Sequence, residues 1–132
     1  MKIGLVYDLR SEYLAAGFPP ADVAEFDSEE TLNALVGALV HLGHQPEQIG
    51  HAQQLCERLV AGARWDLVFN IAEGVRGRCR EAQVPALLEL YNLPYTFSDP
   101  LVCALTLDKS LTKRLVRSAG LNTPASLLIA EK

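Results

Sequence analysis

Apolar and polar residues follow two different periods along this chain, one typical of strands and one typical of helices. Residues 3–7 form a short, almost continuous apolar run that is interrupted by Gly4, and residues 66–71 form a second one. Short continuous runs are typical of strands buried on both faces of a parallel sheet. Residues 44–49 are polar and contain Pro46, which predicts a short strand near a sheet edge.

Helical periods separate these strands. Three sets of apolar residues recur at helical spacing: Leu32, Leu35, Val36, Leu39 and Val40; Ala52, Leu55, Cys56, Leu59 and Val60; and Val84, Leu87, Leu88 and Tyr91. Asp27 followed by Glu30 predicts a capping box, and Gly43 predicts the end of that helix. Residues 92–96 predict a helix stop and a further short strand. The alternation predicts an α/β fold, a three-layer Rossmann-like domain with a short parallel sheet flanked by helices.

The last third of the chain has a different pattern. Asp99 and Pro100 predict the start of one short helix, and a second helix is predicted to end at Gly120. Residues 126–129 then form a strand-like run for which the sequence offers no partner. We therefore expect residues 1–98 to form an N-terminal α/β domain, and residues 99–132 to be linking helices and the start of a truncated second domain.

Composition and charge narrow the classes of function. The chain has 132 residues with 49% hydrophobic content, which is enough for one domain with a real core. Its net charge of -4 gives no overall attraction to nucleic acid or to an anionic membrane, and no apolar run has the length of a membrane span. Three widely spaced cysteines without a CxxC pair, and the lack of a signal-peptide pattern, predict a reduced, cytoplasmic protein.

The stretch EGVRGRCREAQ, residues 73–83, follows the second apolar run and is the strongest candidate for chemistry. Ligands of open α/β sheets bind beyond the carboxyl ends of the strands, where this stretch is expected to lie. Gly74 and Gly77 allow backbone amides to point inward, and Arg76, Arg78 and Arg80 alternate along the loop. Arginine side chains match carboxylate or phosphate oxygens, so the loop is predicted to hold an anionic group.

An alternative interpretation of the same loop is structural. In it, Arg76 and Arg80 are solvated, and Arg78 pairs with Glu73 or Glu81 to fix the loop. Other nucleotide sites are disfavoured, because the segment YDLRSEY after the first strand contains no glycine and no P-loop sequence is present.

Residues 66–124 resemble the end of the N-terminal domain of the D-alanine:D-alanine ligase family, in the ATP-grasp superfamily. The most specific part is LLELYNLPYTFSDPLVCALTLDKSLTKRLVRSAGLNTP, residues 87–124. It is similar to the family's [IL]-P-Y-T-G-S turn, its A-L-x-[ML]-D-K segment and the helix that ends in G-[LV]-x-T-P. With KIGLVYD at the front, the resemblance covers most of the chain in outline.

The resemblance implies an enzyme that joins a small-molecule carboxylate to an amine, both amino acid-like, in the cytoplasm and in the synthesis of the peptidoglycan cell wall. In this family ATP and Mg²⁺ convert the carboxylate to an acyl phosphate, which the amine then attacks. Lys109 matches the family lysine that approaches the ATP phosphates, with a surface lysine as the alternative. The resemblance also implies that this chain lacks most of the ATP site and is inactive alone, and that it is part of a homodimer.

Three departures from the family lie at the ligand end of the predicted sheet. Glu73 stands where the family has a histidine, and Phe97 replaces the glycine of the Y-T-G-S turn. The loop after the first strand lacks the family's glycines, and Glu12 is a loose match to the glutamate that contacts the substrate amino group. The predicted substrate-binding residues are Glu12, Glu73, Gly74, Arg76, Gly77, Arg78 and Arg80. The departures leave the substrate open, and a non-catalytic ligand-binding or regulatory α/β domain is the second hypothesis.

Overall fold

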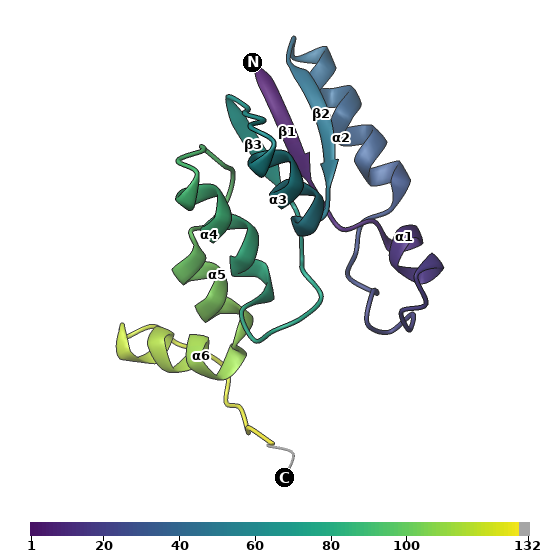
Figure 1. Ribbon diagram of the computed structural model, residues 1–132. Helices are drawn as coiled ribbons and strands as arrows, with labels where there is room; N and C mark the ends of the chain where they lie inside the picture. The colour runs from purple at the N-terminus through teal and green to yellow at the C-terminus, as the bar shows by residue number, and fades with distance from the viewer. Residues whose placement is uncertain (130–132) are drawn as a thin grey trace.

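The computed structural model describes residues 1–129, which form an α/β fold with a three-stranded parallel sheet (Figure 1). The strands are β1 (Lys2–Val6), β2 (Gln45–Gly50) and β3 (Leu67–Asn70), in the order β2-β1-β3. The helices are α1 (Arg10–Ala15), α2 (Glu29–His41), α3 (Ala52–Val60), α4 (Gln83–Leu90), α5 (Pro100–Leu107) and α6 (Lys109–Ser118), and a 3-10 turn, η1 (Arg80–Ala82), precedes α4. The predicted Rossmann-like α/β fold is confirmed, and so is the position of β2 at a sheet edge.

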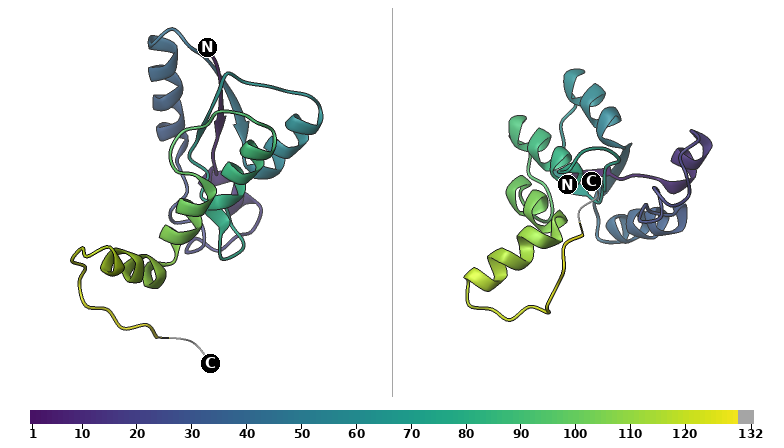
Figure 2. Two further views of the ribbon diagram at one scale, coloured as in Figure 1. Left: turned by 90° about the vertical axis from the view of Figure 1, so that its left-hand side faces the viewer. Right: turned by 90° about the horizontal axis from the view of Figure 1, so that it is seen from below.

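Helices cover both faces of the sheet, as the view from below shows (Figure 2). On one face α3 and α4 pack their buried leucines, Leu55, Leu59 and Leu88, against Val6 and Val68. On the other face Leu32 of α2 packs against Leu5. The first packing is so close that a Cβ atom at Gly4 of β1 would lie 2.5 Å from Ile49 and 3.0 Å from Trp65. Gly4 therefore interrupts the apolar run because the layers on that face leave no room for a side chain.

The start of α2 differs from the sequence prediction by one residue. Ser28 is the N-cap, and its hydroxyl accepts a hydrogen bond from the Thr31 amide at 3.2 Å. Asp27 does not cap the helix, because its backbone pairs with the segment after β1: its amide donates to the Asp8 carbonyl and its carbonyl accepts from the Arg10 amide. The predicted end is correct, since Gly43 adopts a φ of 80° directly after the helix.

Two predicted strands are weaker than expected. Residues 92–96 contribute a single parallel bridge between Tyr95 and Val68, because the Asn70 amide bonds to the Thr96 hydroxyl instead of continuing a ladder. Residues 126–129, predicted as a strand-like run without a partner, have no regular structure, and no strand among residues 1–129 lies beside them. The end of the predicted second segment, residues 130–132, lies outside the described residues.

The predicted apolar stripes are correct at Leu32, Leu55, Leu59, Val84 and Leu88, which are buried, and wrong at three other positions. Val40, Cys56 and Val60 are exposed, with 80% of Val60 accessible. Each follows by one position a residue that packs into the core, Leu39, Leu55 or Leu59, and is therefore turned about 100° away from that direction.

Helix α5 begins where the sequence predicts, and α6 ends just before the predicted Gly120, which has a φ of 76°. The Asp99 carboxylate caps α5 by accepting from the Val102 amide at 2.8 Å, and Asp108 caps α6 by accepting from the Leu111 amide at 2.9 Å. Figure 1 shows α6 extending away from the sheet beyond α5. None of the helices between residues 1 and 129 has the length and apolar character needed to cross a membrane.

Candidate functional site

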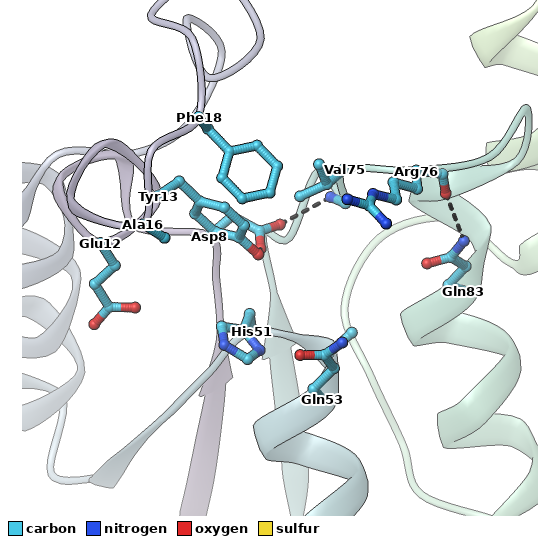
Figure 3. Close-up of a pocket in the computed structure, with 12 residues that line it drawn as sticks. Asp8, Glu12, Tyr13, Ala16, Phe18, His51, Gln53, Val75, Arg76 and Gln83 are labelled. Atoms are coloured by element: carbon cyan, nitrogen blue, oxygen red, sulfur yellow. Dashed lines mark hydrogen bonds between the residues drawn. The ribbon is translucent and has the colours of Figure 1, made fainter.

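A pocket of about 440 Å³ opens at the carboxyl end of β1, where the loop after β1, the start of α3 and the loop after β3 meet (Figure 3). Its lining residues are Asp8, Glu12, Tyr13, Ala16, Phe18, His51, Ala52, Gln53, Gly74, Val75, Arg76 and Gln83. The volume falls in the usual range for small-molecule sites, and the position is where open α/β sheets bind ligands. We take this pocket as the candidate site.

Asp8 joins the two loops that form the pocket. It is 2% exposed, and one carboxylate oxygen accepts hydrogen bonds from the amides of Glu73 and Gly74 at 2.9 and 2.8 Å. The other oxygen accepts from the Tyr13 hydroxyl at 2.6 Å. Hydrogen bonds to a buried carboxylate are among the stronger ones in proteins. A single side chain of the loop after β1 therefore fixes both α1 and the loop after β3.

Gly74 has a conformation that requires glycine. Its φ is 69°, and a Cβ atom there would lie 2.8 Å from the Arg80 carbonyl oxygen. This tight turn directs the Gly74 amide onto Asp8. The Gly74 amide, which the sequence predicted to face an anionic ligand, therefore donates to a carboxylate of the protein itself. Gly77 also has a positive φ, 98°, at the exposed tip of the loop.

The three arginines of the loop lie in three different environments. Arg76 lines the pocket, whereas Arg78 forms an ion pair with Asp108, the N-cap residue of α6. Arg80 pairs with Glu25 at 2.9 Å, and it is also close to Glu81 and Glu73. The structural alternative is wrong for Arg78 and Arg80, because Arg80 and not Arg78 contacts the loop's glutamates, whereas the exposure of Arg76 agrees with it.

Glu73 lies beside the pocket and does not line it. Burial raises the pKa of its carboxyl group, and the negative charges of Glu81 and Glu25 act in the same direction, against Arg80. Glu73 contributes to the pocket through its amide, which donates to Asp8. Its side chain faces the ion-pair cluster around Arg80.

Glu12, predicted from the resemblance, does line the pocket from α1. Tyr13 and His51 were not singled out by the sequence as site residues, although both line the pocket. Burial and the hydrogen bond to Asp8 raise the pKa of Tyr13, so its phenol stays a proton donor. Its ring also makes an edge contact with Phe18, at 5.2 Å between centroids. The only sequence signal for Tyr13 is its place in the loop after the first strand.

Lys109 lies outside the pocket, at the start of α6, where its ammonium group donates to the Thr106 carbonyl at 3.3 Å. Among residues 1–129 no group of three or more His, Cys, Asp or Glu side chains is arranged to hold a metal ion.

Comparison with known proteins agrees with the resemblance seen in the sequence. No family model matches the chain. The D-alanine–D-alanine ligase of Moorella thermoacetica is 41% identical over 95 residues, 72% of this chain and 30% of the ligase. The D-alanine–D-alanine ligase of Aquifex aeolicus is 37% identical over 97 residues, 74% of this chain and 32% of the ligase. An uncharacterized protein of Sinorhizobium fredii, y4sG, is 50% identical over 58 residues, 44% of this chain and 17% of that protein.

The chain spans about a third of the length of these two ligases. The identities of 41% and 37% extend over more than two thirds of this chain. The chain is a D-alanine–D-alanine ligase-like N-terminal region of that family.

Proposed function

We propose that this chain is the substrate-side domain of an ATP-dependent ligase that joins a carboxylate to an amine. The observation that carries the proposal is the pocket at the carboxyl end of β1 in a chain similar to D-alanine–D-alanine ligases. Its lining contains both acidic and basic side chains, Glu12 and Arg76, as an amino acid-like ligand requires. Residues 1–98 form this domain in our proposal, and residues 99–132 lead to the rest of the protein.

In the proposed reaction of the whole protein, ATP and Mg²⁺ activate the carboxylate as an acyl phosphate and an amine replaces the phosphate. The residues of this chain bind and orient the substrate, and Glu12 is proposed to contact its ammonium group. We propose that the loop that carries Glu73, Gly74, Arg76, Gly77, Arg78 and Arg80 forms the other side of the substrate site, with Arg78 and Arg80 holding the loop through their ion pairs. ATP and Mg²⁺ need residues beyond this site, to which Lys109 would add one cation.

The setting of the reaction follows from the same family. We propose a cytoplasmic enzyme of peptidoglycan synthesis that acts as a homodimer on small amino acid-like substrates. Neither nucleic acid nor a membrane is a proposed partner, consistent with the net charge of -4.

A second candidate function is a non-catalytic ligand-binding or regulatory domain. The observation that favours it is Glu73, which replaces a histidine expected from the resemblance and directs its side chain to the cluster around Arg80. A protein with this function would bind a ligand in the pocket without joining it to a second substrate.

The test is ATP hydrolysis coupled to amino acid binding by the whole protein encoded by the reading frame. We expect ADP release that depends on an amino acid, and no ADP release from the 132-residue chain alone. Glu12→Gln is expected to raise the KM for the amino acid about tenfold, because one charge-assisted hydrogen bond contributes about 1.5 kcal/mol or more. Glu57→Gln, on the exposed face of α3, is the matched control and should change nothing.

The two candidate functions give opposite results in this assay. If no amino acid or amine stimulates ADP release from the whole protein, the ligase proposal is wrong and the binding domain replaces it. If the 132-residue chain itself turns over ATP, its role as one domain of a larger active site is wrong.

A further inference from the structure

The pocket has walls of opposite charge. Asp8, Glu12 and the Tyr13 hydroxyl lie on the side formed by the loop after β1 and α1 (Figure 3). Arg76 extends from the loop after β3 on the other side (Figure 3). A ligand that fits both walls carries a positive group toward Glu12, since both oxygens of Asp8 already accept hydrogen bonds, and a negative group toward the guanidinium of Arg76.

The loop after β3 is held at four points. None of these four contacts uses the side chain of Arg76, which lines the pocket. Asp8 holds the Gly74 amide, and Gln83 donates to the Arg76 carbonyl at 2.9 Å. The next two arginines are held by ion pairs with Asp108 and Glu25. Within residues 1–129 the guanidinium of Arg76 forms no ion pair, in contrast to both of those arginines. The backbone of Arg76 is thus fixed while its charge is available to a ligand.

The negative group at Arg76 is distinct from the carboxylate that reacts in the proposed ligation. The reacting carboxylate must reach the ATP phosphates, for which Lys109 is the candidate residue of this chain. Lys109 lies on α6 and does not line the pocket. The group that contacts Arg76 within the pocket is therefore an anionic group other than the reacting carboxylate, which is either an acidic side chain or the carboxylate that the amine substrate keeps.

We propose that the amino acid held in this pocket has an acidic side chain, and that Arg76 is the residue that selects it. The pocket volume of about 440 Å³ accommodates a side chain larger than a methyl group. The assignment of this group as a side chain rests on the proposed ligase function, whereas the requirement for a negative group at Arg76 rests on the pocket alone.

The experiment is an NMR titration of the 132-residue chain with aspartate, glutamate and alanine, each as both enantiomers. The amide signals of Ala16, Gly74 and Val75 report on the pocket. We expect the preferred acidic amino acid to bind at least about tenfold more tightly than alanine, because one charge-assisted contact contributes about that factor. Arg76→Gln should remove this preference, and Arg76→Lys should retain part of it.

Arg114→Gln is the matched control, because it removes an exposed arginine of α6 that neither lines the pocket nor anchors its loops. It should leave the preference for the acidic amino acid within about twofold of the unchanged chain. An unchanged thermal unfolding midpoint in Arg76→Gln, whose residue is exposed, would establish that a lost preference is not a folding defect.

Three results would overturn the inference: equal affinity for alanine and the acidic amino acids, equal losses in Arg76→Gln and Arg114→Gln, or no binding of any of these amino acids. The outcome is separable from that of the proposed function. Acidic amino acids that bind through Arg76 without stimulating ADP release from the whole protein would leave this site standing and remove the ligase. If alanine stimulates ADP release and Arg76→Gln does not change that release, the ligase proposal stands and the selection of an acidic amino acid by Arg76 is wrong.

Discussion

The two parts of this chain are stabilised in different ways. Every buried residue lies in the first part, residues 1–98, where helices cover both faces of the sheet. Helices α5 and α6, in residues 99–129, contain no buried residue, yet they begin as regularly as the others. The first part has a hydrophobic core, and the second depends on capping side chains and on its contacts with the loop after β3.

The two proposed functional features of the chain, the pocket and Lys109, lie in different parts. The pocket lies entirely in the first part, whereas Lys109 lies in the second. Segments with few buried apolar contacts open at lower free energy than core elements. We therefore expect the pocket to be held rigidly, and the segment with Lys109 to adjust more easily to what binds beside it. Four predictions test this contrast.

Truncation of a buried leucine should have the largest effect. Leu88 of α4 is 0% exposed, and Leu88→Ala is expected to lower the free energy of unfolding by about 2–5 kcal/mol, because it leaves a cavity in the core. Leu115 of α6 is 49% exposed, and Leu115→Ala should cost less than about 1 kcal/mol. Urea denaturation measures both. Similar losses in the two variants would mean that the two parts are not stabilised differently.

Removal of the Asp8 carboxylate should have the next largest effect. Asp8→Ala leaves the amides of Glu73 and Gly74 and the Tyr13 hydroxyl without their acceptor, and each unsatisfied donor costs about 1–3 kcal/mol if it remains buried. We expect a loss of about 3 kcal/mol in urea denaturation. Asp22→Ala, at an exposed aspartate of the following loop, is the control and should be neutral. A neutral Asp8→Ala would show that the loops do not depend on this side chain.

Removal of a helix cap in the second part should act locally. Asp99→Ala removes the acceptor of the Val102 amide and is expected to cost about 1 kcal/mol, which raises the hydrogen exchange rates of the α5 amides about fivefold. Amides of β1 should be unaffected. Ser98→Ala, one residue earlier, is the control, and an equal effect there would argue against a role for the cap.

The smallest expected effect is the contribution of the Glu73 carboxyl group to the change of the free energy of unfolding with pH. Because its pKa is raised above the ordinary value of 4.5, the folded state holds the proton more tightly than the unfolded state. The associated stability is present at low pH and is lost as the pH rises through the folded-state pKa. As the pH rises from about 4 to about 7, the unchanged chain should therefore lose stability relative to Glu73→Gln, which has no carboxyl group to titrate at this position. A difference that is constant over this range in urea denaturation would contradict the raised pKa.

Local features of the chain were predictable from the sequence. Gly43 ends α2 and Asp99 begins α5 because end signals act through neighbouring backbone groups. Pro46 correctly indicated an edge strand, since a proline lacks the amide that an inner strand must donate. The rule that ligands bind at the carboxyl ends of parallel strands brought Glu12 and Arg76 to the same pocket.

Features that join distant segments were not predictable in the same way. Asp8 and Gly74 are 66 positions apart, and their hydrogen bond exists only because β1 and β3 are neighbours in the sheet. Asp27 looked like a helix cap, but its backbone pairs with the segment after β1 and leaves the cap to Ser28. The sequence also gave no means to distinguish Arg76 from Arg78, whose partner Asp108 is 30 positions away.

The most direct test of this account is hydrogen exchange at the amides of Glu73 and Gly74, which their hydrogen bonds to the Asp8 carboxylate should protect. We predict exchange as slow as that of the β1 amides in the unchanged chain, and exchange approaching that of residues 121–129 in Asp8→Ala. Fast exchange of both amides in the unchanged chain would contradict the account, because the pocket would then have no fixed wall on the side of Arg76.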